Sequence, residues 1–162
     1  MSPHRSTKRL GEFLMERGLL SPAQLERALE HQRLTKKFLG EVLLELRMVS
    51  PQHLLSTLSK QFGIPHESLS PERVDWTFVD QLPPSALSLE HGFPIRADAE
   101  SVTVAIVNPL DAWTLSQMGQ LARFQNVTPV LVLPEELANI QQAYRQRVMQ
   151  RMTQHLQADD HV

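Results

Sequence analysis

Two stretches of the sequence carry the same residue types at the same spacing, and these residues are the first candidates for chemistry. The first set is Arg9, Leu10, Gly11, Leu25, Leu29 and Gln32, and the second set is Leu39, Gly40, Leu54, Leu58 and Gln61. The arginine can make a forked, charge-assisted contact to a phosphate or to a guanine edge. A glycine early in a helix lets an anion approach the exposed backbone N–H groups there. Two such helix ends would suit a ligand that carries two phosphates.

The same residues also fit a purely structural role, and the residues alone leave this alternative open. Glycine lowers helix stability, so the two Leu-Gly pairs need a reason, and close packing of two helices is as good a reason as a ligand. Leucines spaced four apart on a helix more often belong to the core than to a binding site. Gln32 and Gln61 fall near helix C-terminal ends, where an amide can donate and accept at once.

The two sets belong to a repeat with a constant offset. Positions 10–32 match positions 39–61 with ten identities in 23. Each copy predicts helix, turn, helix, because Ser21-Pro22 and Ser50-Pro51 are typical N-cap and N1 residues. Gly18 is typical of the left-handed residue that ends a helix. Arg47 takes its place in the second copy, so it must adopt that conformation at some cost or end the helix differently.

The organisation of the whole chain predicts the α+β class. Residues 7–63 are expected to form a four-helix unit of two pseudo-repeated helix-turn-helix motifs, and residues 64–75 a linker. Residues 76–157 are expected to form a small α/β sandwich with a three-stranded sheet and a long C-terminal helix. Residues 158–162 are expected to be a disordered tail.

Composition and missing motifs exclude several functions. The net charge is −2 and there is no cysteine, so we expect no DNA or RNA partner and no thiolate metal site. The sequence has no G-x-x-x-x-G-K-[ST] loop, no G-x-S-x-G and no H-E-x-x-H, and its seven histidines are scattered. We therefore expect no catalytic residues, no metal and no enzyme. No apolar run approaches the roughly 20 residues of a membrane span, so a cytoplasmic protein without membrane insertion is expected.

The duplicated motif resembles the MshEN family, the domain at the N-terminus of type II secretion and type IV pilus assembly ATPases. The family pattern is R-L-G-x-x-L, G-[LI]-[LIV] and L-x-x-x-L-x-x-Q, followed by a looser copy. The first copy fits at Arg9-Leu10-Gly11, Leu14, Gly18-Leu19-Leu20, Leu25, Leu29 and Gln32. The second fits at Leu39-Gly40, Leu43, Val49, Leu54, Leu58 and Gln61, with Phe38 and Arg47 as departures. Ile106–Asp111 also resembles the family, so the resemblance covers roughly residues 8–146.

This resemblance implies a non-catalytic receptor for cyclic di-GMP, with no cofactor besides that ligand. Arg9 and the backbone of Leu10-Gly11 would contact the ligand, Leu25 and Leu29 would form an apolar floor, and Gln32 would tie the motif together. Leu39, Gly40, Leu54, Leu58 and Gln61 would repeat these roles, and Asp111 would reach a guanine edge. The receptor would signal to an unidentified protein partner, such as a secretion or pilus ATPase or its inner-membrane platform. The alternative is a docking adaptor of such a system that needs no nucleotide.

Overall fold

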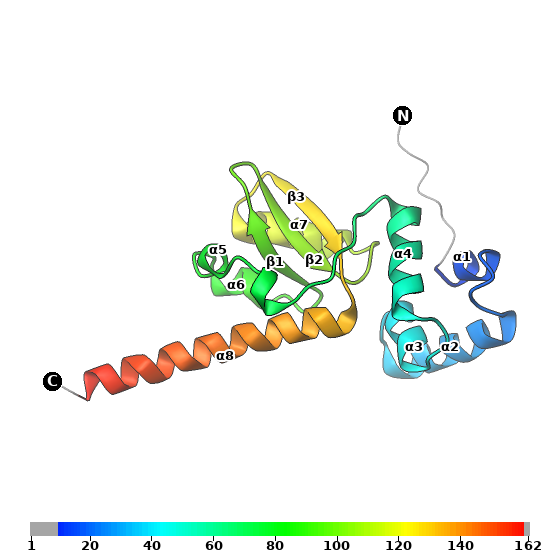
Figure 1. Cartoon of the computed structure of the whole chain (residues 1–162), viewed down its shortest axis with the longest axis horizontal. Helices are drawn as coiled ribbons and strands as arrows, with labels where there is room; N and C mark the ends of the chain where they lie inside the picture. The colour runs from blue at the N-terminus through cyan, green and yellow to red at the C-terminus, as the bar shows by residue number, and fades with distance from the viewer. Residues whose placement is uncertain (1–9, 161–162) are drawn as a thin grey trace. The chain divides into compact units, whose positions relative to one another are not determined.

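The structure, a computed structural model, describes residues 10–160 and confirms the predicted α+β class (Figure 1). Its contacts divide the chain into two compact units, Met1–Thr57 and Leu58–Val162, with the boundary inside one helix. The helices are α1 (Leu10–Glu16), α2 (Pro22–Thr35), α3 (Leu39–Glu45), α4 (Pro51–Phe62), the 3-10 turn η1 (Pro71–Arg73), α5 (Trp76–Val79), α6 (Pro84–Leu87), α7 (Ala112–Ala122) and α8 (Pro134–Asp159). The strands are β1 (Gly92–Ala97), β2 (Ser101–Ile106) and β3 (Asn126–Leu131).

The repeat predicted from the sequence is present in the backbone of the helical unit. Helix α3 begins and ends at the positions that the repeat aligns with the two ends of α1, and α4 begins at the position aligned with the start of α2. Both α1 and α3 end in the same left-handed turn, at Gly18 (φ +69°) and at Arg47 (φ +55°). Of the two alternatives for Arg47, the structure therefore shows the left-handed conformation.

The hydrogen bonds of the two turns match as well. The N–H of Leu19 donates to the Leu14 carbonyl at 3.0 Å, and the N–H of Met48 donates to the Leu43 carbonyl at 3.0 Å. This bond to the carbonyl five residues back is part of the Schellman motif, which satisfies the last carbonyls of a helix. The second copy thus keeps the geometry that glycine favours without having the glycine.

The second helix of each copy begins at the predicted serine cap. Ser21 Oγ accepts from the Gln24 N–H at 3.2 Å, and Ser50 Oγ accepts from the His53 N–H at 3.2 Å. In the first copy the bond is reciprocated, because Gln24 Oε1 accepts from the Ser21 N–H at 2.9 Å and completes a capping box. Helix α2 therefore has a fuller N-cap than α4.

The second unit is built on a three-stranded sheet in the order β1-β2-β3. Strands β1 and β2 form an antiparallel hairpin, while β3 returns parallel to β2 after the crossover helix α7. The last three residues of β2, Val104, Ala105 and Ile106, are buried in succession, so this end of the strand is covered on both faces of the sheet. Ser101 and Thr103, earlier in the strand, are only partly buried. Gly119 lets α7 approach β3 closely, since a Cβ there would lie 3.0 Å from Val127 Cγ2.

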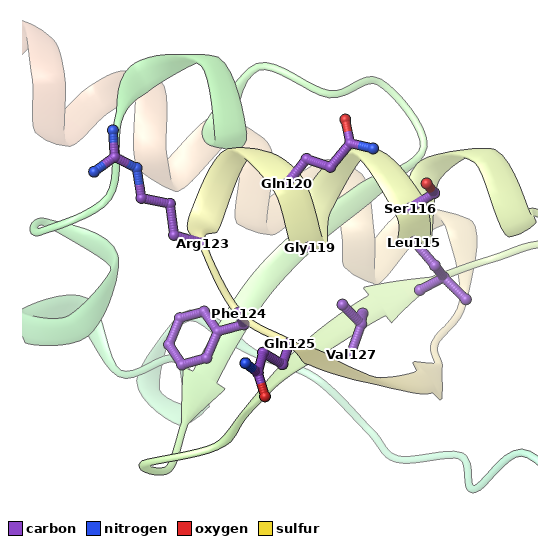
Figure 2. A pocket seen from close by; sticks show the side chains of 8 residues that line it. All are labelled: Leu115, Ser116, Gly119, Gln120, Arg123, Phe124, Gln125 and Val127. Atoms are coloured by element: carbon purple, nitrogen blue, oxygen red, sulfur yellow. The ribbon is translucent and has the colours of Figure 1, made fainter.

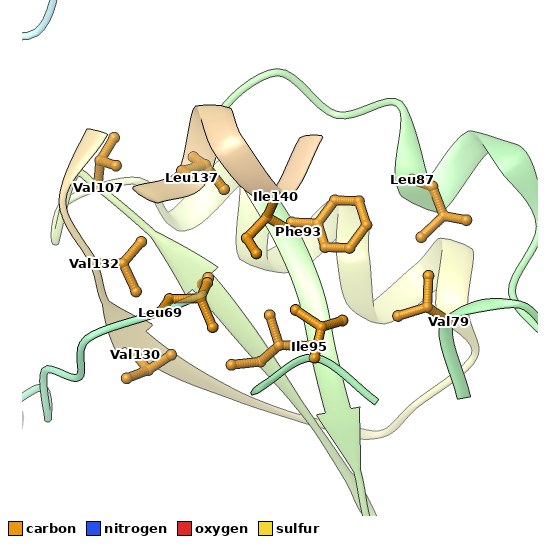
Figure 3. Close-up of a cluster of buried hydrophobic side chains, with 12 residues drawn as sticks. Leu69, Val79, Leu87, Phe93, Ile95, Val107, Val130, Val132, Leu137 and Ile140 are labelled. Atoms are coloured by element: carbon orange, nitrogen blue, oxygen red, sulfur yellow. The ribbon is translucent and has the colours of Figure 1, made fainter. Parts of the chain in front are cut away.

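One face of this sheet packs against α8 and the short helices (Figure 3). Phe93, Ile95 and Ile140 lie at the centre of the cluster and are fully buried. The Phe93 ring contacts Trp76 and Tyr144, with centroid distances of 6.2 and 5.8 Å. These contacts fix the first half of α8 on the sheet.

Residues 64–75, expected as a linker, lie along the second unit. The Leu131 N–H donates to the Pro65 carbonyl at 2.8 Å, and the Leu69 N–H donates to Glu136 Oε2 at 2.7 Å. Leu69 and Val74 are buried in the core cluster. The helix α8 runs to Asp159, so it includes the first two residues of the expected tail. None of the helices in residues 10–160 has the length and apolarity to cross a membrane.

Candidate functional site

The start of the motif places its glycine against a leucine of the next helix. Arg9 lies outside the described residues, and Leu10 and Gly11 open α1 and are both buried. A Cβ on Gly11 would overlap Leu25 Cδ1, so only glycine fits without a shift of that leucine. Close packing of α1 against Leu25 of α2 therefore accounts for the preference for glycine at position 11.

The second copy has a looser form of this contact with one addition. Leu54 also lies beside Gly40, but its Cδ2 atom is 3.6 Å from the position of a Cβ, which is an ordinary van der Waals contact and no overlap. The ring of Phe38, the residue that occupies the place of Arg9 in the repeat, also lies there, with its Cε1 atom 2.8 Å from that position. The backbone of Gly40 is thus covered by an aromatic ring of its own copy.

The leucines of the two copies differ in exposure. Leu25 is half-buried and Leu29 is 37% exposed, whereas Leu54 and Leu58 are 4% and 2% exposed. Leu29 and Leu58 are equivalent positions of the repeat, so the same residue type has become surface in one copy and core in the other. Of these four leucines, the two in the first copy are the ones that a ligand can reach.

Gln32 connects the two copies within the helical unit. Its Nε2 atom donates to the Lys37 carbonyl at 3.1 Å, in the segment that leads into α3. The Lys37 side chain forms an ion pair with Glu45. The hydrogen bond to the Glu45 carboxylate and its negative charge raise the pKa of Lys37 above its usual value. His31 Nε2 lies 3.8 Å from the same carboxylate. The equivalent glutamine, Gln61, is half-buried near the end of α4.

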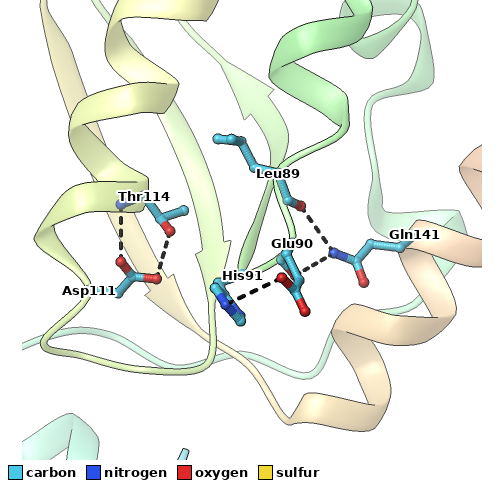
Figure 4. Close-up of polar contacts among 6 residues, drawn as sticks. All are labelled: Leu89, Glu90, His91, Asp111, Thr114 and Gln141. Carbon is cyan, nitrogen blue, oxygen red and sulfur yellow. Dashed lines mark hydrogen bonds and ion pairs between the residues drawn. The ribbon is translucent and has the colours of Figure 1, made fainter. Parts of the chain in front are cut away.

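Asp111 has a structural role that the sequence analysis missed. It is the N-cap of α7, where Oδ1 accepts from the Thr114 N–H at 3.0 Å and Oδ2 accepts from Thr114 Oγ1 at 2.6 Å (Figure 4). An aspartate directly before a helix, with threonine three residues later, is a signal that could have revealed this cap. Asp111 belongs to the second unit, whereas the leucines of the first copy belong to the first unit.

The second unit has two surface depressions, and neither is lined by a predicted site residue. One has a volume of about 480 Å³ and is lined by Leu115, Ser116, Gly119, Gln120, Arg123, Phe124, Gln125 and Val127 (Figure 2). The other has a volume of about 370 Å³ and is lined by Leu87, Ser88, Leu89, Glu90, Gln141, Tyr144 and Arg145. The part of the chain that the structure describes holds no cluster of three or more metal-ligating side chains.

The comparisons with known proteins define the class of this domain. The model of the MshEN domain matches residues 62–151, which is more than half of the sequence. The chain belongs to the MshEN domain family. The matched residues comprise the last residue of α4 and most of the second unit, so the leucines and glycines of the duplicated motif precede the match.

The alignments with two individual relatives are longer than the family match and include part of the helical unit. The type IV pilus assembly ATPase PilB of Thermus thermophilus is 34% identical over 116 residues, which are 70% of this chain and 13% of PilB. A structure of MshE with cdg, cyclic di-GMP, superposes with a TM-score of 0.68 at 29% identity and covers 85% of this chain and 99% of that chain. Both alignments are longer than residues 58–162, so they extend into the helical unit. The N-terminal domain of XpsE shares the fold, with a TM-score of 0.57 at 18% identity, covering 81% of this chain and 90% of that chain.

Proposed function

We propose that this protein is a non-catalytic module that binds cyclic di-GMP through its duplicated motif. The observation that carries the proposal is the similarity to MshE with cdg, which spans 99% of that chain. The accessible leucines of the first copy supply an apolar surface of the kind that such a ligand needs. PilB is an ATPase by name, but this chain spans only 13% of PilB. The sequence of this chain has no Walker-type loop.

The first copy is the principal half-site in this proposal. Leu25 and Leu29 form an apolar floor for a base, because both keep accessible surface on one face of α2. Arg9 supplies the positive charge for a phosphate, next to the backbone of Leu10 and Gly11. Gln32 holds the segment between α2 and α3 through its bond to Lys37.

The second copy contributes more to the scaffold than to the ligand. Leu54 and Leu58 are buried, and Phe38 lies over Gly40 where the first copy has an arginine in the equivalent place. We assign Leu39, Gly40 and Gln61 to a second, weaker half-site. Asp111 is the proposed contact to a guanine edge, since each carboxylate oxygen retains acceptor capacity beyond its bond to Thr114.

The output of the proposed receptor is a protein contact in the cytoplasm. A module without catalysis can transmit ligand occupancy only through a partner that prefers one of its two states. The family relation points to a secretion or pilus ATPase, or its inner-membrane platform, as that partner. A module that bound the nucleotide without such a partner would transmit no signal.

Calorimetric titration of the full chain with cyclic di-GMP tests the proposal, with GTP and ATP in parallel. We expect saturable binding by cyclic di-GMP and stabilisation by linkage, about 2.7 kcal/mol at a hundredfold excess over Kd. Arg9→Ala is expected to lose this binding. The matched control is Arg27→Ala, because Arg27 is exposed and lies on the opposite side of α2 from Leu25 and Leu29.

The same titration has a clear negative result. Folded protein that shows neither heat nor a rise in melting temperature at saturating cyclic di-GMP would contradict the proposal. In that case the nucleotide-independent docking adaptor is the better account of the family relation. Loss of binding in both arginine variants would contradict the specific role of Arg9.

A further inference from the structure

The last part of α8 exposes apolar side chains along one line. Met149, Met152 and Leu156 are 66%, 60% and 69% exposed. Their spacing of three and four residues places them on one side of the helix. Figure 1 shows this part of α8, drawn in orange to red, extending past the sheet and short helices of its own unit. We call these three residues the α8 stripe.

The α8 stripe is not the side of the helix that holds it to the second unit. Ile140 and Tyr144 pack into the core, and Arg147 lies over the Trp76 ring at 4.7 Å and bonds Asp80 at 2.9 Å. At about 100° per residue, the stripe is turned by roughly two fifths of the helix circumference from these anchors. The stripe therefore stays accessible when α8 is docked on its own unit.

Charges flank the stripe with opposite sign at its two ends. Arg145 precedes it and is exposed, while Asp159 and Asp160 follow it and are exposed. Between them, Arg147 and Arg151 are paired with Asp80 of their own unit. The other polar positions of this stretch include glutamines at 146, 150, 154 and 157. A helix with this order of charges complements a second identical helix that runs in the opposite direction.

We propose that the α8 stripe is the contact between two copies of this chain, paired antiparallel about a two-fold axis near Met152. In this register Met149 of one copy lies opposite Leu156 of the other, and Arg145 lies opposite Asp159 and Asp160. A parallel pair would instead place arginine beside arginine and aspartate beside aspartate, which is repulsive. The contact is isologous, so the same residues serve both copies.

The proposal goes beyond nucleotide binding and does not depend on it. Residues 145–159 form about 22 Å of helix, which gives a narrow contact. Such a small apolar surface fits a reversible dimer better than an obligate one. A paired α8 would bring two copies of the module together and give a protein that binds the module two contacts.

Sedimentation velocity of the full chain over a concentration series tests the pairing. We expect a monomer–dimer equilibrium in which Met152→Asp raises the dissociation constant at least about tenfold, because it places a charge at the centre of the contact. Gln154→Asp is the matched control, since it adds the same charge on the opposite side of α8 and should leave the equilibrium unchanged. A monomer at all concentrations would overturn the proposal, and so would a dimer that tolerates Met152→Asp.

The absence of cysteine from the chain allows a direct test of orientation. Met149→Cys and Leu156→Cys are made separately, and each protein is oxidised alone and in an equal mixture. Antiparallel pairing predicts a disulfide-linked species chiefly in the mixture. Crosslinking of each variant mainly with itself would indicate a parallel pair and would overturn the proposed geometry. Circular dichroism of each variant shows whether α8 is retained.

Discussion

The two copies of the duplicated motif share ten residues of 23 and almost the same backbone, but they differ in what their equivalent residues face. Leu29 is 37% exposed and Leu58 is 2% exposed. Gly11 meets a leucine, whereas Gly40 meets a leucine and the ring of Phe38. The repeat therefore determines where a residue lies on its helix. The residues that pack around each copy determine whether that residue is exposed or buried.

This difference indicates that the two copies have different roles, packing in the second and an accessible surface in the first. The second copy has buried its leucines and has filled the place of an arginine with an aromatic side chain. The first copy keeps its leucines accessible, as a binding surface requires. Each of the next three predictions changes equivalent residues in both copies and asks whether their effects differ as this comparison requires.

The largest expected difference is in the energetics of Leu58 and Leu29. Leu58→Ala should lower the free energy of unfolding by about 3 kcal/mol, because it removes a buried side chain and leaves a cavity. Leu29→Ala should lower it by less than about 1 kcal/mol, since that side chain already contacts solvent. Urea unfolding followed by circular dichroism measures both values. Equal losses would show that the two leucines do not differ in role.

The next difference concerns the left-handed residues that end α1 and α3. Arg47→Gly should stabilise the protein by about 0.5 to 1 kcal/mol, because glycine relieves the strain of φ +55°. The reciprocal change, Gly18→Arg, should destabilise it by a similar amount. Thermal unfolding of both variants tests the pair. A Gly18→Arg protein as stable as the parent would show that the turn does not discriminate between these residues.

The smallest difference is expected at the two serine caps. Ser21→Ala and Ser50→Ala should each lower stability by about 1 kcal/mol. Ser21→Ala should have the larger effect by a few tenths of a kcal/mol, because it also breaks the reciprocal bond with Gln24. Denaturant titration of the two single variants and the double variant resolves the order. A larger loss at Ser50 would reverse the expected ranking of the caps.

Local features of the fold were predictable from the sequence because each depends on a few neighbouring residues. The serine caps, the proline at the first helical position and the strained Arg47 all follow from helix-end stereochemistry. The three-stranded sheet was also expected, and the structure confirms it. Capping by Asp111 had the same kind of local signal, but its functional interpretation obscured it.

Features that depend on distant residues were not predictable in this way. Leu29 and Leu58 have the same residue type and the same place in the repeat, so no local pattern distinguishes their burial. Residues 64–75 looked like a linker because of their prolines and serines, yet Glu136, far along the chain, bonds the Leu69 N–H. The candidate site itself was recognisable because its residues recur at fixed spacing, whereas its asymmetry required the structure.

The most direct test of the account compares two leucines of equal exposure, one inside the motif and one outside it. Leu29 is 37% exposed and Leu46 is 36% exposed. Titration with cyclic di-GMP should show that Leu29→Gln weakens binding about tenfold or more, as loss of an apolar contact of about 1.4 kcal/mol requires, while Leu46→Gln leaves binding unchanged. If both variants bind as the parent does, or if both lose binding equally, the first copy is not the ligand half-site.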